Sequence, residues 1–319
     1  MGALYLFSII TVGAQTIGAR GNSDTPPRPP RIDELLAVLQ LTSQQSTTVQ
    51  NTIDTERVAI RALDEALGLG LTEAISDGAI VQNMLAPKPD GMRGKAAEIT
   101  DVVSGQKRAG RFGWKAQQAT LLAFAADAYS NEMGITNRFF SKENAPNGNE
   151  ALLARFKRTT DPEDTIDPAT GKSDIDMAAD FMRFLAPPAR LAATAQSTVD
   201  EPIFSQAGCA TCHTPVLRTG PNPIAALDRK AVNLFSDLLL HDMGSLNDGI
   251  AQAGAGTHEM KTLPLWGLRA HGPYLHDGRA TTLDAAIRAH DGEGAISRDR
   301  YIGMTPQLKR NLQDFLNTP

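Results

Sequence analysis

The two cysteines of this 319-residue chain lie three positions apart, and a histidine follows the second one directly. Cys209, Cys212 and His213 stand in the stretch 207-AGCATCHTP-215. Cys-x-x-Cys-His is the attachment signature of a c-type haem: two thiols bond the vinyl groups and the histidine binds the iron. A disulfide framework is excluded, because it needs several spaced pairs. We therefore expect one covalent haem c on Cys209 and Cys212, with His213 as an iron ligand.

Zinc is the main alternative, since Cys-x-x-Cys with histidine also occurs in zinc sites. A histidine directly behind the second cysteine is not a typical zinc spacing, however, and further ligands would have to come from scattered histidines. A thioredoxin-like redox site is less well supported, because no βαβ pattern surrounds the motif. The pattern favours haem.

All histidines of the chain lie after residue 212, and residues 1–208 contain neither histidine nor cysteine. That part cannot attach a haem through thioethers or ligate iron through imidazole, which confines such chemistry to the last third. The six are His213, His241, His258, His271, His276 and His290.

Frequent Ala and Leu with 5% aromatic residues predict a mainly helical protein. Helices are expected over 111–134, 174–186 and 305–319, with a long surface loop over 141–173. Pro187-Pro188 predicts a boundary between a helical domain over 31–187, which has no haem motif, and a second domain over 188–319. A net charge of −5 gives a nucleic-acid partner no electrostatic support.

Residues 1–30 read as a signal and linker. The apolar run 3–14 resembles the core of a secretory signal, although no Lys or Arg precedes it, and a Pro-rich stretch follows over 21–30. The alternative is an ordinary buried segment or a mis-chosen start. The run is too short to span a bilayer comfortably, and no other stretch competes as a membrane span.

The sixth iron ligand should come from the apolar face of another helix. The candidates are Met243, Met260, Met304 and the five remaining histidines. In 281-TTLDAAIRAH-290, Thr281 and Asp284 form a capping-box-like pair. His290 shares the apolar stripe of this short helix with Leu283, Ala286 and Ile287.

The stretch 262-TLPLWGLRAHGPYLHDGRATTLDAAIRAH-290 resembles the signature after the second haem of bacterial di-haem cytochrome c peroxidases. It also resembles their relative that matures methylamine dehydrogenase and, in particular, the branch often labelled thiol oxidoreductases. The resemblance covers roughly residues 66 to 318. The other matching pieces are GCATCHTP, FSDLLLHDMG, RFGWKA and NEMGIT.

The resemblance implies a cytochrome c-like domain at the C-terminus and a remnant of a second, related helical domain. In that superfamily the distal ligand of the second haem follows the histidine of the HDG motif by fourteen residues. Counting from His276 gives His290. The position holds Met in the peroxidases and Tyr in the methylamine-dehydrogenase relative. Ligation by His213 and His290 would leave no open position for peroxide.

Three further residues are assigned to the haem environment by resemblance. His241 and His276 would line it near the propionates, and Arg279 could pair a propionate. In the alternative, Asp277-Gly278 is simply a turn and Arg279 is solvated. We interpret His258 and His271 as surface residues.

Family members carry a first Cys-x-x-Cys-His in the N-terminal domain, whereas this chain has no cysteine before Cys209. Either the gene lost that segment or the sequence begins after it. By the same resemblance, Trp114 stands at the position of a tryptophan that relays electrons between the two haems. The favoured alternative is that Trp114 is a core aromatic residue beside Phe112. Met133 is either an orphaned distal ligand or core filler.

These observations predict a one-haem protein that transfers electrons to other redox proteins. One alternative is a peroxidase-type di-haem oxidoreductase whose catalytic haem segment is missing from this chain, and another is a degenerate, non-catalytic remnant. We expect a periplasmic location, because covalent haem attachment in bacteria is completed outside the cytoplasm. The resemblance also allows a calcium ion between the domains, which no residue pattern supports.

Overall fold

The computed structural model describes residues 68–156, 161–188, 195–270 and 272–318. The expected signal and linker over 1–30 and the helical pattern over 31–67 lie outside these ranges. The described residues form nine α-helices and three two-stranded antiparallel sheets of two or three residues a strand. Helices thus outweigh strands, as the composition predicts.

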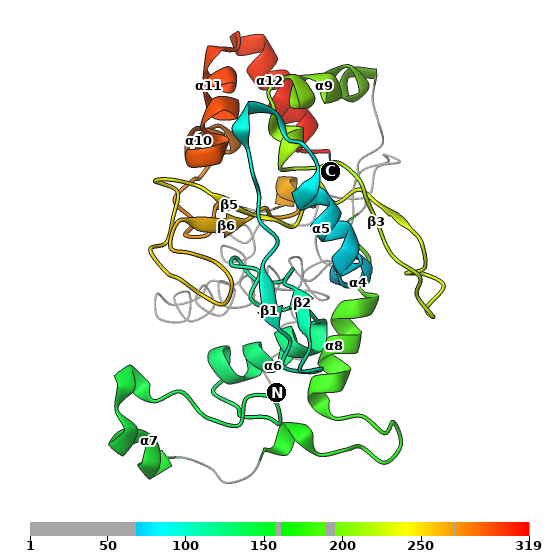
Figure 1. The fold of residues 1–319 in the computed structure, drawn as a ribbon, viewed down its shortest axis with the longest axis vertical. Coiled ribbons are helices and arrows are strands. Elements are labelled where there is room, and N and C mark those ends of the chain that lie inside the picture. The colour runs from blue at the N-terminus through cyan, green and yellow to red at the C-terminus, as the bar shows by residue number, and fades with distance from the viewer. Residues whose placement is uncertain (1–67, 157–160, 189–194, 271, 319) are drawn as a thin grey trace, which may run out of the picture. The chain divides into compact units, whose positions relative to one another are not determined.

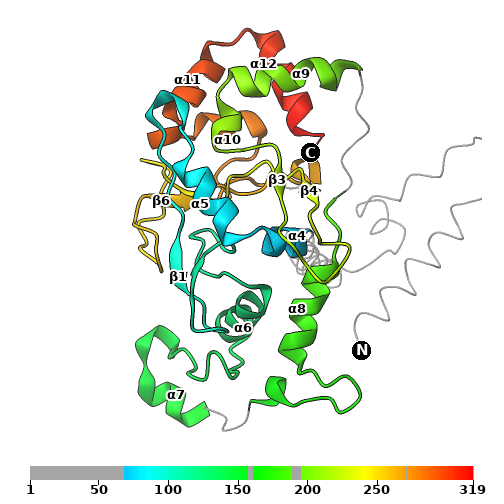
Figure 2. The same ribbon diagram turned by 45° about the vertical axis from the view of Figure 1, so that its right-hand side comes forward.

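The helices are α4 (Leu69–Ala74), α5 (Asp77–Leu85), α6 (Leu121–Glu132), α7 (Glu150–Phe156), α8 (Asp174–Phe184), α9 (Ala195–Gln206), α10 (Leu283–Arg288), α11 (Ala295–Gly303) and α12 (Pro306–Leu316). The paired strands are β1 (Glu98–Thr100) with β2 (Lys107–Ala109), β3 (Leu217–Arg218) with β4 (Ala231–Val232), and β5 (Leu240–Asp242) with β6 (Glu259–Lys261). Figures 1 and 2 both place α9 to α12 at one end, the strands in the middle, and α6, α7 and α8 at the other end.

Two of the predicted helices are confirmed. Ser173 starts α8 with a capping box to Asp176, and Ile175 and Ala179 on its apolar face are buried. Thr305 caps α12 by accepting a hydrogen bond from the backbone N–H of Leu308.

Within the stretch 111–134, the amphipathic face from Leu121 to Tyr129 is confirmed, because α6 begins at Leu121, whereas residues 111–120 are not helical. Gly113, with φ of 78°, turns the preceding chain back, and Phe112 pairs with Gln118 in an isolated bridge. The 141–173 stretch is likewise not a pure loop, since it contains α7.

An aromatic core joins α9 and α12, the two helices that support the cysteine loop. Phe204, Phe235 and Phe315 contact one another with ring centres 5.3–6.0 Å apart, and each is at most 1% exposed. Tyr301 and Leu312 complete the cluster.

A second core crosses the proposed boundary at residue 188. Ile75 and Ile80 of the N-terminal part pack with Leu217, Leu234 and Leu238 of the C-terminal part, and all five are buried. The two parts therefore share apolar surface that neither would bury alone.

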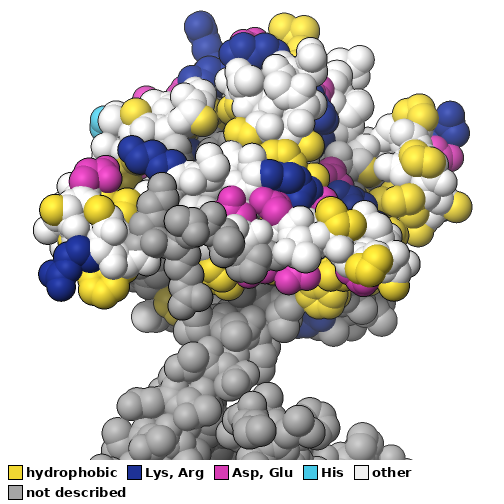
Figure 3. Space-filling view, turned by 90° about the horizontal axis from the view of Figure 1, so that it is seen from below, with side chains coloured by type: hydrophobic (Ala, Val, Ile, Leu, Met, Phe, Trp, Pro, Cys, Tyr) yellow, Lys and Arg dark blue, Asp and Glu magenta, His cyan; other side chains and the backbone are white. Residues whose placement is uncertain are grey.

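Exposed aromatic side chains occur at the α7 and α8 end, at Phe156, Phe181 and Phe184. Figure 3, viewed from that end, shows hydrophobic side chains interspersed with charged ones.

Candidate haem site

The loop that carries both cysteines follows directly on α9. Gly208 has φ of 87°, and a Cβ there would lie 2.7 Å from Ser297 Oγ, so the turn favours glycine. Cys209–Thr211 then form a 3-10 turn, and the backbone N–H of His213 donates to the carbonyl of Cys209 at 2.9 Å. Both thiols are free and partly buried.

His213 is held so that one ring nitrogen is left for a metal. Its Nδ1 lies 2.9 Å from the carbonyl oxygen of Phe235, which can only accept. Nδ1 therefore carries the proton and Nε2 is free. Burial, together with nearby His290, lowers the pKa of His213 to about 4. The imidazole is neutral near pH 7, which is the form that binds metals.

His290 is prepared in the same way. It follows α10, and its Nδ1 donates to the carbonyl of Ala286 at 2.9 Å. Arg298 donates to the His290 carbonyl at 2.9 Å, which fixes the backbone. Burial lowers the pKa of this histidine too. Hydrogen bonds of this kind orient histidines that ligate metals.

The capping box predicted for α10 was wrong. Thr282, not Thr281, is the N-cap and accepts a hydrogen bond from the N–H of Ala285 at 3.1 Å. Asp284 instead accepts from Tyr301 at 2.6 Å and from Arg288 at 2.7 Å. The helix starts one residue later than expected, and the predicted position of His290 on its inner side is kept.

The two imidazoles have the spacing of a ligand pair. The ring centres of His213 and His290 lie 6.5 Å apart, with 58° between the ring planes. Two imidazoles that bind one metal from opposite sides, with metal–nitrogen bonds of about 2 Å, have centres roughly 6 Å apart. One iron atom thus fits between them.

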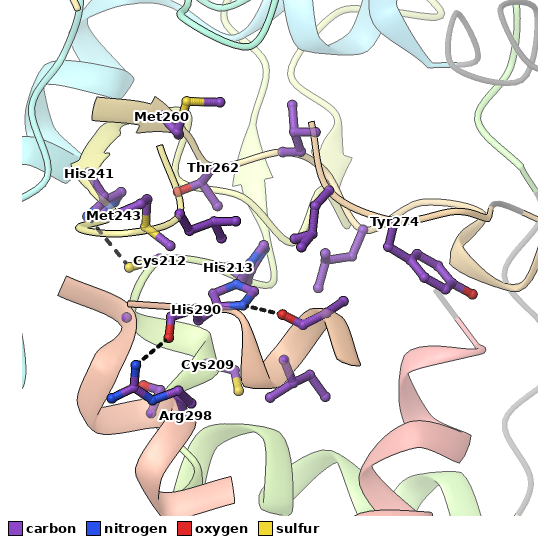
Figure 4. Close-up of a pocket in the computed structure, with 18 of the residues that line it drawn as sticks. Cys209, Cys212, His213, His241, Met243, Met260, Thr262, Tyr274, His290 and Arg298 are labelled. Carbon is purple, nitrogen blue, oxygen red and sulfur yellow. Dashed lines mark hydrogen bonds between the residues drawn. The ribbon is translucent and has the colours of Figure 1, made fainter. Parts of the chain in front are cut away.

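Both histidines and both cysteines line one pocket (Figure 4). Its empty volume is about 1370 Å³, which includes space open to solvent. Much of its wall is apolar, with Leu246, Leu265, Leu268, Leu283, Ile287 and Leu316. An apolar wall suits a porphyrin face, the thiols suit its vinyl groups, and the neutral imidazoles suit its iron. The residues present therefore fit a haem c.

His241 lies in a buried charged cluster beside the cysteine loop. It is 2% exposed, with Nε2 3.1 Å from Asp237 and Nδ1 2.7 Å from Glu293. Cys212 Sγ lies 3.6 Å from the same Nδ1. Burial alone would lower the pKa of His241, but these hydrogen bonds outweigh it and raise the pKa to about 12. The ring is a cation between two carboxylates and is not free to bind iron.

Lys88 joins this cluster from the N-terminal part of the chain. Its ammonium lies 3.0 Å from the fully buried carboxylate of Asp237 and donates to the carbonyl of Thr211, inside the cysteine loop, at 2.8 Å. Asp237 in turn donates its backbone N–H to the carbonyl of Cys212 at 2.9 Å. The charged cluster therefore holds the cysteine loop as well as His241.

His276 lines the pocket, whereas Arg279 does not. The guanidinium of Arg279 pairs with Asp277 at 2.5 Å, and its side chain is 45% exposed. Gly278, with φ of 70°, sits in the turn between them. This geometry matches the alternative in which Asp277-Gly278 is a turn, and a contact of Arg279 with a propionate stays a prediction.

The other ligand candidates separate by position. Met243 and Met260 line the pocket, while Met304 packs against the aromatic core instead. His258 is exposed, as expected, and His271 lies outside the described residues. Met243 remains the alternative to His290 as distal ligand.

The interpretation of Trp114 as a core residue was wrong. Its side chain is 39% exposed, lines the pocket, and meets the ring of His276 edge-on with centres 6.0 Å apart. The turn at Gly113 carries it away from Phe112, which is buried with α6. Met133 is 53% exposed and is therefore not core filler.

Metal-binding groups among the described residues bear on the zinc alternative. Three side chains there come close enough to hold an ion: Cys212, Asp237 and His241. Cys209 is not part of this group, and Lys88 already pairs with Asp237. The cluster therefore lacks the second thiol that the zinc interpretation needs.

Sequence reasoning missed the residues that support the ligands. Asp237 and His241 are four apart in 235-FSDLLLHD-242, a spacing that could have suggested their contact. Nothing in the sequence could have paired Asp237 with Lys88, which lies 149 residues away.

Within the described ranges, the structure contains no helix that is both long and apolar enough to cross a bilayer.

Comparison with known proteins supports the haem chemistry. Residues 37–318 match the family described as "Di-haem oxidoreductase, putative peroxidase". No curated protein matches the chain. Solved structures with some likeness include hydrazine synthase of Kuenenia stuttgartiensis, at 20% identity and a TM-score of 0.32, covering 47% of this chain and 56% of the other. A MauG-like protein associated with microbial copper homeostasis shows 17% identity and a TM-score of 0.39, covering 94% of each chain. The present chain thus spans little more than half of the hydrazine synthase chain. The family match covers most of the sequence and includes the whole pocket-lining region, and the chain therefore belongs to the di-haem oxidoreductases.

Proposed function

We propose that this protein is a c-type cytochrome that transfers electrons and carries one haem on Cys209 and Cys212. His213 and His290 would hold the iron from its two sides. The observation that carries the proposal is the pair of neutral imidazoles 6.5 Å apart, each with its Nδ1 tied to a backbone carbonyl. When bound, haem supplies a one-electron iron couple.

The residues of this chain decide what that couple can do. With His213 and His290 both holding the iron, neither peroxide nor water would find an open site on it. Apolar side chains of the pocket wall, such as Leu265 and Ile287, would exclude water from a bound haem. A histidine in place of a methionine also favours a lower reduction potential, because methionine ligation raises it. Electron transfer is the chemistry that remains.

The spectrum of the purified protein tests this function. A pyridine-haemochrome assay should give one haem per chain, and the absorption spectrum should be low-spin. His290→Ala should make it high-spin, while Met243→Leu, the matched control at the competing ligand, should leave it low-spin. A low-spin spectrum in His290→Ala together with a high-spin one in Met243→Leu would transfer the ligand role to Met243.

A di-haem peroxidase is the second candidate, and the family match favours it. Its catalytic haem would need a Cys-x-x-Cys-His from sequence outside this chain, because both cysteines here are already used. Finding such a motif upstream in the reading frame, with two haems per full-length product, would favour the peroxidase.

The same proposal includes the bounds of the cytochrome c-like domain, the cellular location and the kind of redox partner. We take residues 188–319 as the cytochrome c-like part, since α9 to α12 and the cysteine loop gather around the pocket. We place the protein in the periplasm and expect redox partners with basic surfaces, because the net charge is −5. Cell fractionation that recovers the haem-loaded chain only from the cytoplasm would contradict this location.

A further inference from the structure

Lys261 is a buried cation in the wall of the haem pocket. It ends β6, is 6% exposed, and is one of the residues that line the pocket. Its backbone N–H donates to the carbonyl of Trp114 at 2.9 Å, which fixes the end of the strand. Its neighbours Met260 and Thr262 are labelled on this wall in Figure 4.

The ammonium of Lys261 has no carboxylate partner in the described part of the chain, where no Asp or Glu oxygen lies within 4.0 Å of it. Asp237 acts on it only from beyond that distance, and this carboxylate already pairs with Lys88 and His241. Burial lowers the pKa of Lys261 to about 8. Because a buried charge without a partner is costly, the site favours a counter-ion that the described chain does not supply.

Two arginines near the pocket, Arg298 and Arg279, are already paired with carboxylates. Arg298 also lines the pocket, but it pairs with Asp291 at 3.0 Å and with Asp299 at 2.8 Å. Arg279 pairs with Asp277 outside the pocket. Among the described Lys and Arg side chains that line the pocket, Lys261 is the one without an acidic partner.

A haem c brings two carboxylates of its own. Its propionates leave the ring on the side opposite the vinyl groups, and the vinyl groups are fixed by Cys209 and Cys212. Figure 4 shows Met260 and Thr262 across His213 from Cys209, while Cys212 lies near His241, whose strand β5 pairs with β6. Lys261 lines the same pocket, and among the described Lys and Arg side chains of its wall it is the one free to pair with such a carboxylate.

We propose that Lys261, rather than Arg279, is the cation that binds a haem propionate. This assignment rests on the proposed function, since it requires a haem attached to Cys209 and Cys212. The ion pair would give Lys261 its counter-ion and fix the tilt of the ring in the pocket. A retained positive charge beside the ring also favours the reduced iron, which carries one positive charge fewer.

Three variants test the assignment: Lys261→Met, which removes the charge at similar length, Lys261→Arg, which keeps it, and Arg279→Met, the matched control. Resonance Raman spectra of the purified haem proteins report the propionate bending bands, and a spectroelectrochemical titration reports the reduction potential. We expect shifted bands and a lower potential in Lys261→Met, and wild-type bands in Arg279→Met. Lys261→Arg should keep a potential near that of the wild type.

The outcomes separate the two proposals. A wild-type protein without one low-spin haem would overturn the proposed function before any variant is compared. With that haem in place, wild-type bands in Lys261→Met, or shifted bands in Arg279→Met alone, would overturn the role of Lys261. A haem-loaded Lys261→Met protein with a high-spin spectrum would show that iron ligation depends on Lys261 and would likewise overturn its role at a propionate. Failure of Lys261→Met to load haem, with full loading in Lys261→Arg, would support the need for the charge.

Discussion

Replacing His241 with Gln should change how the stability of the protein depends on pH. In the folded protein His241 is a buried cation between Asp237 and Glu293, with its pKa raised to about 12. An unfolded histidine has a pKa of about 6.5. A raised pKa stabilises the fold fully below pH 6.5, and this stabilisation is lost as the pH rises toward the folded value.

The size of the effect follows from proton linkage. Between pH 7 and pH 9 the folded His241 keeps its proton while the unfolded one loses it. The free energy of unfolding therefore falls by about 1.4 kcal/mol per pH unit once the unfolded histidine is neutral. Allowing for partial protonation at pH 7, the loss over this range is about 2.5 kcal/mol. Thioether formation at Cys212 removes the thiol as a hydrogen-bond partner of His241, yet the carboxylates of Asp237 and Glu293 remain to hold the proton.

Guanidinium unfolding of the haem-loaded protein at pH 7, 8 and 9 measures this directly. The stability gap between wild type and His241→Gln should shrink by about 2.5 kcal/mol from pH 7 to pH 9. Other titrating groups are common to both proteins and cancel in the difference. His258→Gln, at an exposed histidine, is the matched control. A constant gap for His241→Gln would mean that the folded ring is neutral and that the charged cluster is misassigned.

Two further changes test the packing around the pocket. Phe315→Ala, at a fully buried ring, should lower the free energy of unfolding by about 3–5 kcal/mol. Phe156→Ala, at a ring that is 69% exposed, should change it by less than about 0.5 kcal/mol. Guanidinium unfolding measures both values, and equal losses would contradict the assigned core. Gly292→Ala should lower the melting temperature, because Gly292 has a φ of +56° and a Cβ there would overlap the carbonyl of Asp242. Gly303→Ala, at the end of α11, should raise the melting temperature slightly, because a Cβ there would meet no atom within 4 Å. A rise in both variants would refute the strain argument.

The proposed haem ligands could be picked out from the sequence because their signals are local. Cys209, Cys212 and His213 are fixed by one short motif, and His290 follows from helix periodicity as well as from a motif spacing. The position of Trp114 was not predictable in the same way. It depends on a left-handed turn at Gly113 that takes the chain out of a helical pattern, and periodicity does not record such turns.

Supporting contacts were the hardest to foresee. Lys88 reaches Asp237 across 149 residues, and Lys261 differs from a surface lysine only in its burial. Both depend on how distant segments pack, which a single sequence does not encode in its local pattern. The resemblance pointed to Arg279 for the propionates, whereas burial and pairing point to Lys261.

The contact of Lys88 with the cysteine loop bears on how such a chain can evolve. Residues 68–187 contain no Cys or His, so they can neither attach a haem through thioethers nor ligate iron through imidazole. Lys88, however, secures Thr211 and Asp237, and Ile75 and Ile80 supply part of the apolar core that Leu234 and Leu238 need. A deletion that trimmed the chain to its haem-bearing third would expose that core and release the loop. The segment therefore acts as a scaffold for the cysteine loop and for the apolar core that the two parts share.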